Sequence, residues 1–175
     1  NTLNMIYSHA LERSPKVPDM ILGLSQNMRY ILYECNESYV PLIKEIQFLQ
    51  DYIDLQKMRI EDRGIVNFEV LGNSGGLQIA PMLLIGFIEN AFKHASKNTI
   101  NGIEIDIQLQ VQGEYLLLEV KNNHEKELIS NELEREGGIG LENVRKRLEL
   151  AYAELYELKM LNEDSQFHVQ LYLKL

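Results

Sequence analysis

The segment 89–94, with the sequence ENAFKH, holds side chains that can act on a metal-bound phosphate. In a helix, at about 100° per residue, Asn90, Lys93, His94 and the later Lys97 lie on one stripe. An amide oxygen is a hard ligand suited to Mg²⁺, and lysine and histidine side chains pair with phosphate oxygens. The stripe therefore fits a metal–phosphate site, and it also fits an ordinary solvated helix face.

A second candidate is the glycine cluster Gly137–Gly140 (GGIG), which comes just before a predicted helix. Glycines there let the backbone approach a ligand closely, and the free N–H groups of a helix start attract an anion. The spacing matches neither the phosphate-binding loop nor the dinucleotide fingerprint. The alternative is a flexible linker or a turn. Together, the stripe and the glycines would make a nucleotide site across one face of a sheet.

The first third of the chain carries apolar residues at helical spacing. One helix is expected to end at Ser14-Pro15, a second to cover Val17–Tyr33, and a third to run from Pro41 to about Glu61. The third helix has a narrow apolar seam, formed by Leu42, Ile46, Leu49 and Ile53. The seam suits either a dimer contact or packing on the domain that follows.

From Gly64 onward, predicted strands and helices alternate. The alternating apolar residues of Ile103–Val111 indicate a half-buried antiparallel strand, which a turn joins to Tyr115–Lys121. Further strands are predicted at Ile65–Leu71, Glu157–Leu161 and Phe167–Leu173, and helices at Pro81–Lys97 and Leu141–Ala153. Because each strand has one apolar face, we expect an α+β domain with helices on one side of a single sheet.

Composition excludes several classes of function. The 175 residues are 45% hydrophobic and 25% charged, which is typical of a globular domain. A net charge of −9 argues against nucleic acid as the main partner. The single cysteine, Cys35, excludes a disulfide framework and a cysteine-based zinc site, and no apolar run approaches the roughly 20 residues of a membrane span. Because the chain begins at Asn1, we expect it to be a piece of a longer protein.

Several segments resemble sensor histidine kinases, and more narrowly those of the LytS/YehU type. Residues 83–94 (LLIGFIENAFKH) resemble the N box of these kinases, and residues 138–148 (GIGLENVRKRL) resemble their second glycine box. The opening Asn1–Asn4 resembles the end of the phosphoacceptor motif. Met28–Tyr30 and Leu49–Arg59 resemble the segment before the ATP-binding domain. The motifs occur in the family's order and span nearly the whole chain.

The resemblance implies a Bergerat-type ATP-binding fold of the GHKL superfamily at residues 63–175. This fold is a two-layer α/β sandwich with helices on one face of a mixed, largely antiparallel sheet. Residues 1–62 would be a helical dimerisation and phosphotransfer segment. The resemblance also implies ATP and Mg²⁺ as cofactors, with Mg²⁺ on Asn90 and with Glu89 as a base or an outer residue. The implied ATP-binding residues are Asn90, Lys93, His94, Asn122, Gly138, Gly140 and Leu141.

The expected reaction moves the γ-phosphoryl group of ATP to a histidine nitrogen and then to an aspartate of a response regulator. The acceptor histidine should lie four residues before Asn1. We expect a homodimer through the N-terminal helices. We also expect a cytoplasmic domain of an inner-membrane protein, whose membrane contact comes only from upstream parts.

The first glycine box departs from the family's pattern. After the strand ending at Lys121, the kinases carry Asp-x-Gly-x-Gly, whereas this chain carries residues 122–126 (NNHEK). Asn122 can still accept a hydrogen bond from the adenine amino group, without a charge. One alternative is therefore a degenerate module that dimerises and docks partners with weak or no ATP turnover. Another is a different GHKL protein, such as an anti-sigma serine kinase or a simple ATPase, against which the N-terminal motifs argue.

Overall fold

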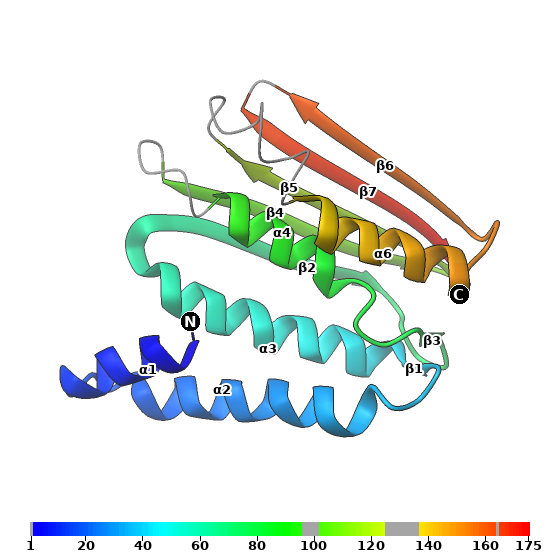
Figure 1. Cartoon of the computed structure of the whole chain (residues 1–175). Helices are drawn as coiled ribbons and strands as arrows, with labels where there is room; N and C mark the ends of the chain where they lie inside the picture. Colours follow the sequence, from blue (N-terminus) through cyan, green and yellow to red (C-terminus); the bar gives the residue numbers. More distant parts are fainter. Residues whose placement is uncertain (1, 96–101, 125–136, 164) are drawn as a thin grey trace.

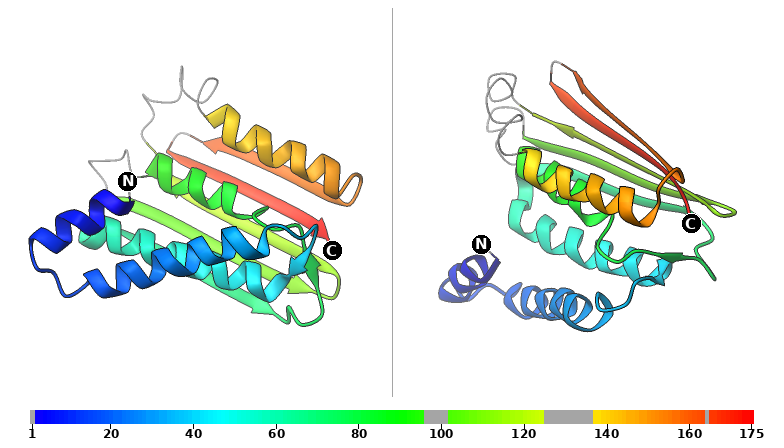
Figure 2. Two further views of the ribbon diagram at one scale, coloured as in Figure 1. Left: turned by 60° about the horizontal axis from the view of Figure 1, so that its bottom comes forward. Right: turned by 45° about the vertical axis from the view of Figure 1, so that its right-hand side comes forward.

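A five-stranded sheet with helices on one face forms the body of the chain (Figure 1). The computed structural model describes residues 2–95, 102–124, 137–163 and 165–175, and only the backbone of 137–139. Helices α3, α4 and α6 lie against the sheet, and α1 and α2 lie outside α3 (Figure 2). The α+β class and the helices on one side confirm the predicted architecture.

Three helices form the N-terminal part, as predicted. They are α1 (Thr2–Leu11), α2 (Val17–Arg29), which continues as the π-helical turn η1 (Tyr30–Glu34), and α3 (Leu42–Ile60), which is followed by the short helix η2 (Glu61–Arg63). A proline in the first turn of α2 suits that position, because the missing N–H has no partner within the helix there.

The apolar seam of α3 packs within this chain. Leu42, Leu49 and Ile53 are completely buried, and Ile46 is 8% exposed. All four belong to the same hydrophobic core as the helix and strand residues of the following domain. Of the two possibilities for the seam, the structure therefore shows packing on the domain.

The sheet has the order β2-β4-β5-β7-β6. Its strands are β2 (Gly64–Gly72), β4 (Ile103–Gln112), β5 (Tyr115–Asn123), β6 (Tyr156–Glu163) and β7 (Gln166–Lys174). β2 pairs parallel with β4, and the other neighbours are antiparallel. A small antiparallel ladder between β1 (Val40–Pro41) and β3 (Gln78–Ile79) was not predicted from the sequence.

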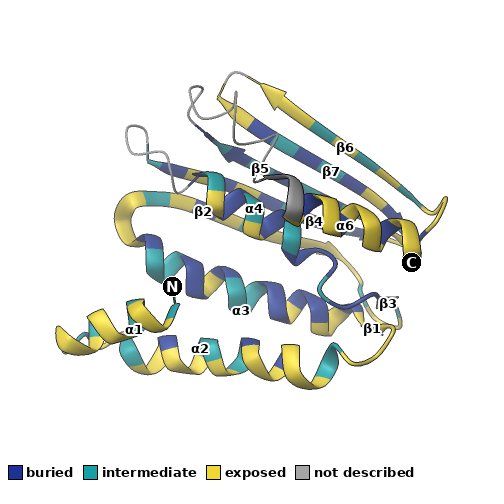
Figure 3. Cartoon of the chain, viewed as in Figure 1, coloured by how far each residue is buried: buried dark blue, intermediate teal, exposed yellow. Residues whose placement is uncertain are grey.

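Each strand of the five-stranded sheet has one apolar face and one polar face. In β4, Ile105, Ile107 and Leu109 are buried against the helices, whereas Asp106 faces outward (Figure 3). On the outer face, Asn67 donates a hydrogen bond to Asp106 across the parallel pair, at 2.6 Å. The period of two in the sequence thus fixes which face the helices cover.

Helices α4 (Ile85–Ala95) and α6 (Gly137–Ala151) run antiparallel and side by side (Figure 1). They approach closely at Gly86, where a Cβ atom would lie 2.4 Å from Cγ2 of Val144. The glycine cluster forms the first turn of α6, rather than a loop before it. The glycine at position 86 therefore sets how near the two helices come.

The close approach predicts opposite effects for two glycine-to-alanine changes. Gly23→Ala in α2 should raise stability by up to about 1 kcal/mol, because alanine favours a helix and the new Cβ makes an ordinary 3.9 Å contact. Gly86→Ala should lower stability, because overpacking costs about 1–3 kcal/mol and outweighs that gain. Chemical denaturation measures both.

The double variant Gly86→Ala/Val144→Ala provides the control for this reasoning. It should lose less stability than the sum of the two single variants by about 1 kcal/mol, since the shortened side chain makes room for the new Cβ. Gly86→Ala as stabilising as Gly23→Ala would show that the helices do not press together there.

Candidate functional site

The polar stripe of α4 lies as the sequence predicts. Phe87, Ile88 and Ala91 are buried on the apolar side of the helix. On the other side, Asn90 and His94 are half-buried, and Glu89 and Lys93 are exposed. Lys97, the last member of the stripe, lies outside the described residues. The stripe is thus partly shielded from solvent, and it carries an amide oxygen, an imidazole and an ammonium group.

The contact between α4 and α6 brings the two candidate segments level with each other. Gly86 lies against Val144, and the helices run in opposite directions. One helical turn further along α4 is Asn90, and one turn back along α6 is Gly140. We infer that these two residues occupy matching levels of adjacent helices. The C-terminal end of α4, the N-terminal end of α6 and the end of β5 all lie at one edge of the molecule (Figure 2).

The first turn of α6 has room in front of it. A Cβ atom on Gly140 would meet nothing within 4 Å, and the residue is exposed. Leu141 and Val144 are buried and anchor the helix on the core. The first N–H groups of an α-helix have no partner within the helix, so this turn offers backbone donors to an anion. Gly138 belongs to the same turn.

Asn122 carries a buried oxygen that has no partner within the described ranges. It lies at the end of β5 and is 1% exposed. Its Nδ2 donates to the carbonyl of Asn123 at 3.0 Å, whereas Oδ1 accepts no hydrogen bond from the described residues. Buried polar atoms nearly always have a partner, and this exception marks a place where a ligand can donate a hydrogen bond.

His124, two residues further on, shares this strand face and is also buried. Its Nε2 pairs with Oδ1 of Asn162 at 2.9 Å, and among the described residues Nδ1 has no partner. Sequence reasoning assigned no role to His124. A second buried polar atom, without a partner among the described residues, thus lies beside Asn122 at this end of β5.

The segment that leads into α4 is held from two sides. Met82 there has a φ of +55, a left-handed conformation that costs roughly 1–2 kcal/mol outside glycine. Its N–H donates to Oε2 of Glu45 in α3 at 2.9 Å, and its carbonyl accepts from Nη1 of Arg147 in α6 at 3.1 Å. Arg147 also donates to the carbonyl of Pro81. Because this segment is pinned in a non-helical shape, α4 begins at Ile85 and not at the predicted proline.

Sequence reasoning did not identify Glu45 or Arg147 as parts of the site. Glu45 is completely buried, three residues after Leu42 and four before Leu49 on the apolar seam. A carboxylate on the apolar face of a helix was the available signal. Arg147 lies in the segment that resembles the second glycine box. The spacing of residues in that segment does not predict that the Arg147 side chain contacts the residues before α4.

Desolvation changes the acid–base behaviour of two carboxyl groups near α4. It raises the pKa of Glu45, against the opposing effect of hydrogen bonds from Tyr30 and from backbone amides. It also raises the pKa of Glu89, although that residue as a whole is exposed. A carboxylate with a raised pKa accepts a proton more readily near neutral pH, which suits the role of a base.

The described residues contain no group of three or more His, Cys, Asp or Glu side chains placed to hold a metal ion. Mg²⁺ does not require such a group, because it keeps several waters and takes phosphate oxygens together with one or two protein ligands. A single amide oxygen on Asn90 therefore remains a sufficient protein contact. Within the described ranges, no helix has the length and apolar character needed to cross a membrane.

Known proteins resemble this chain over nearly its whole length. Residues 1–64 match the family described as Histidine kinase. Sensor protein LytS of Oceanobacillus iheyensis is 30% identical over 185 residues, which cover 97% of this chain and 29% of the relative. Sensor histidine kinase BtsS of Escherichia coli is 26% identical over 167 residues, covering 95% of this chain and 29% of the relative. The chain thus spans less than a third of these relatives.

Solved structures of histidine kinases share the fold. The nucleotide-free catalytic domain of histidine kinase ThkA superposes with a TM-score of 0.53 at 15% identity, covering 78% of this chain and 94% of that one. The histidine kinase domain of the blue-light-activated kinase EL346 from Erythrobacter litoralis gives 0.53 at 14% identity, with 97% and 84% covered. A ThkA structure in complex with the response regulator TrrA gives 0.50 at 15% identity, with 99% and 57% covered.

The unpartnered oxygen of Asn122 generates a stability prediction. Asn122→Leu should be as stable as the wild type or more stable by about 1 kcal/mol, because it removes a buried acceptor whose desolvation no described residue offsets. Thermal and chemical denaturation measure this effect. The matched control is Asn27→Leu, at another buried asparagine whose Oδ1 lacks a partner among the residues that the structure describes, but which lies in α2, far from this edge. A large destabilisation by Asn122→Leu would mean that the oxygen has a partner in the free protein.

Proposed function

The chain belongs to the sensor histidine kinases of the LytS type, and we propose that it is the ATP-binding catalytic part together with the adjoining helical segment. In this proposal residues 63–175 bind ATP and residues 1–62 belong to the dimerisation and phosphotransfer region. The observation that carries it is the buried oxygen of Asn122, which has no partner in the described part of the chain and lies at the same edge as the polar stripe of α4 and the open first turn of α6.

The proposed nucleotide lies across this edge. The adenine amino group donates to Oδ1 of Asn122, and the phosphates meet the first turn of α6 at Gly138, Gly140 and Leu141. Asn90 provides the amide oxygen for Mg²⁺, whose chemistry is to neutralise charge on the phosphate oxygens. Lys93 and His94 extend the same stripe and add donors to the triphosphate. A local group of cations is needed here, because the chain as a whole carries a charge of −9.

The proposed reaction transfers the γ-phosphoryl group of ATP to a histidine nitrogen. The bond from phosphorus to the bridging oxygen breaks, ADP leaves with that electron pair, and a phosphorus–nitrogen bond forms. The acceptor imidazole gives up a proton, for which Glu89 with its raised pKa is the proposed acceptor. Positioning and charge neutralisation supply most of the catalysis in phosphoryl transfer. Transfer to an aspartate of a response regulator follows.

The N-terminal helices support a homodimer. None of the residues of α1 is buried in this chain. Large apolar side chains are exposed along α1, α2 and η1, namely Leu3, Tyr7, Leu11, Ile21, Leu22, Met28, Ile31, Leu32 and Tyr33. An apolar surface of this extent calls for a partner, and a second copy of the same helices is the proposed one. The response regulator is the second proposed partner. In this proposal the chain forms a cytoplasmic domain of an inner-membrane protein, and other parts of that protein contact the membrane.

A second candidate function is a docking module with little or no ATP turnover. Its support is the altered first glycine box, where a buried histidine, His124, stands in place of a glycine. Calorimetric titration with a Mg–ATP analogue separates the two functions. Binding heat and a raised melting temperature support the kinase, whereas neither signal supports the docking module.

Asn90→Ala tests the metal ligand. We expect Mg²⁺-dependent nucleotide affinity to fall by at least about 10- to 100-fold, because the amide oxygen is the proposed protein contact to Mg²⁺. Stability should change by less than about 0.5 kcal/mol, since the side chain is not part of the core. Asn36→Ala is the control, because this exposed amide lies in the N-terminal part and donates to the carbonyl of Leu32. Unchanged affinity in Asn90→Ala would contradict the assignment.

Gly140→Val tests the phosphate contact. The new side chain meets open space in the free protein, so stability should hold within about 0.5 kcal/mol. Nucleotide affinity should fall by at least about tenfold, which corresponds to about 1.4 kcal/mol of binding free energy. The new side chain would keep the phosphates away from the backbone N–H donors. Isothermal calorimetry and denaturation measure the two effects. Wild-type affinity in a folded variant would rule out close approach at this glycine.

A further inference from the structure

Glu45 joins three elements through hydrogen bonds in the protein interior. It is completely buried in α3. The phenol of Tyr30, in η1, donates to its Oε2 at 2.5 Å. The backbone N–H of Met82 donates to the same oxygen at 2.9 Å, and the N–H of Leu84 donates to Oε1 at 3.4 Å. One carboxylate thus connects the end of α2 with the segment that starts α4.

Few side chains of α2 are buried against the rest of the chain. Only two residues of α2, Met20 and Asn27, are buried, and most of its surface faces away from the body. The helix continues into η1, where the ring of Tyr30 stacks on Phe48 of α3 with centroids 4.5 Å apart. The phenol of Tyr30 is therefore a buried polar link from this outer helix to the interior, beside the surface ion pair between Glu34 of η1 and Lys44 of α3.

The connection to the site is direct. Met82 is held by Glu45 through its N–H and by Arg147 of α6 through its carbonyl. The left-handed conformation of Met82 persists only if its surroundings hold it. The segment around it sets where α4 begins, and the register of α4 against α6 sets the levels of Asn90 and Gly140. A change at the phenol of Tyr30 thus reaches the segment before α4 through two hydrogen bonds, and α6 through a third, from Arg147 to Met82.

We propose that Glu45 is a positioning residue that couples the placement of α2 to the segment before α4, so that losing the Tyr30 bond loosens this segment and weakens Mg–nucleotide binding. The coupling of α2 to this segment stands on the hydrogen bonds alone, and its effect on the nucleotide rests on the proposed function. Because coupling between two sites is reciprocal, a bound nucleotide in turn stabilises the docked position of α2. A shift of the outer helices then becomes a change in the catalytic site.

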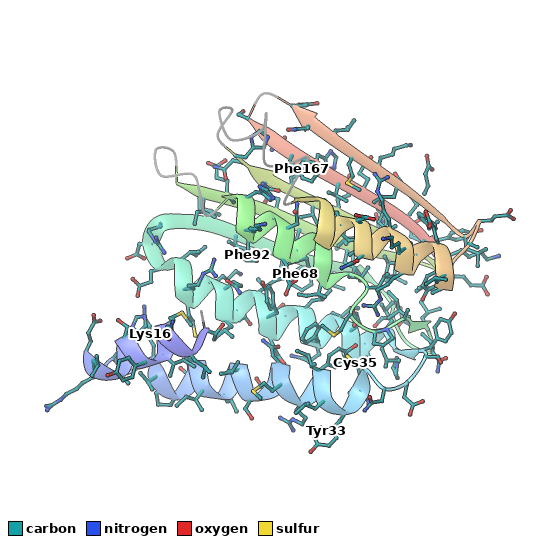
Figure 4. The ribbon with its side chains drawn as sticks, viewed as in Figure 1. Lys16, Tyr33, Cys35, Phe68, Phe92 and Phe167 are labelled. Atoms are coloured by element: carbon teal, nitrogen blue, oxygen red, sulfur yellow. The ribbon has the colours of Figure 1, made fainter. Side chains whose placement is uncertain are left out.

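Hydrogen exchange tests the coupling without a nucleotide. Tyr30→Phe removes one hydroxyl and keeps the ring that stacks on Phe48. The matched control is Tyr33→Phe in the same turn, a residue that is 74% exposed and points away from the body (Figure 4). This variant also removes one hydroxyl only, and it keeps the apolar ring that belongs to the proposed dimer surface. We expect the amides of Met82 and Leu84 to exchange about tenfold faster or more in Tyr30→Phe only, with the β5 amides unchanged. Equal rates in the two variants would overturn the coupling.

Nucleotide affinity tests the consequence for the site. With Mg–ATP analogue, Tyr30→Phe should bind roughly 2- to 30-fold more weakly than the wild type and Tyr33→Phe should bind equally well. A merely structural role of Tyr30 would lower the melting temperature and leave this affinity unchanged, which would overturn the positioning role. If the wild type itself binds no nucleotide, the proposed function fails, and the exchange rates still decide whether α2 is coupled to the segment before α4.

Discussion

A carboxylate shut away from water must be hydrogen-bonded, and this constraint on Glu45 organises the chain around the candidate site. Its two oxygens accept bonds from the end of α2 and from the segment that starts α4. Removing any of these donors would destabilise the buried carboxylate or increase the fraction of Glu45 that is protonated. The start of α4 is therefore fixed by an interaction that lies outside α4 itself.

The sheet gives this arrangement a rigid base. Its inner face is apolar except at the end of β5, where Asn122 is buried, and α3, α4 and α6 share one core with it. The two helices with candidate ligands come close because Gly86 has no side chain to separate them. The end of β5 contributes the remaining piece, a buried amide oxygen that no described residue satisfies. Helix placement and sheet register together thus produce one edge that can receive a polar ligand.

The periodicities of the sequence predicted most of the fold. Alternation placed β4, β5 and β7 correctly, because a strand that covers a core on one face must repeat every two residues. The predictions were wrong where local pattern competes with contacts from far along the chain. Helix α4 starts at Ile85 because Glu45 and Arg147 hold the residues before it, and the short strand β3 exists only because β1 lies opposite. The roles of the candidate site residues stay predictions.

The sequence by itself determined which faces of the helices and strands are apolar, the order of the elements, and the set of polar residues on α4. Tertiary structure alone decided that the seam of α3 is covered by this chain, that Asn122 is buried with an oxygen that no described residue satisfies, and that Arg147 reaches the carbonyl of Met82. The reason is physical. A local pattern specifies which side of an element avoids water, but the partner that covers it is chosen by packing between segments distant in sequence.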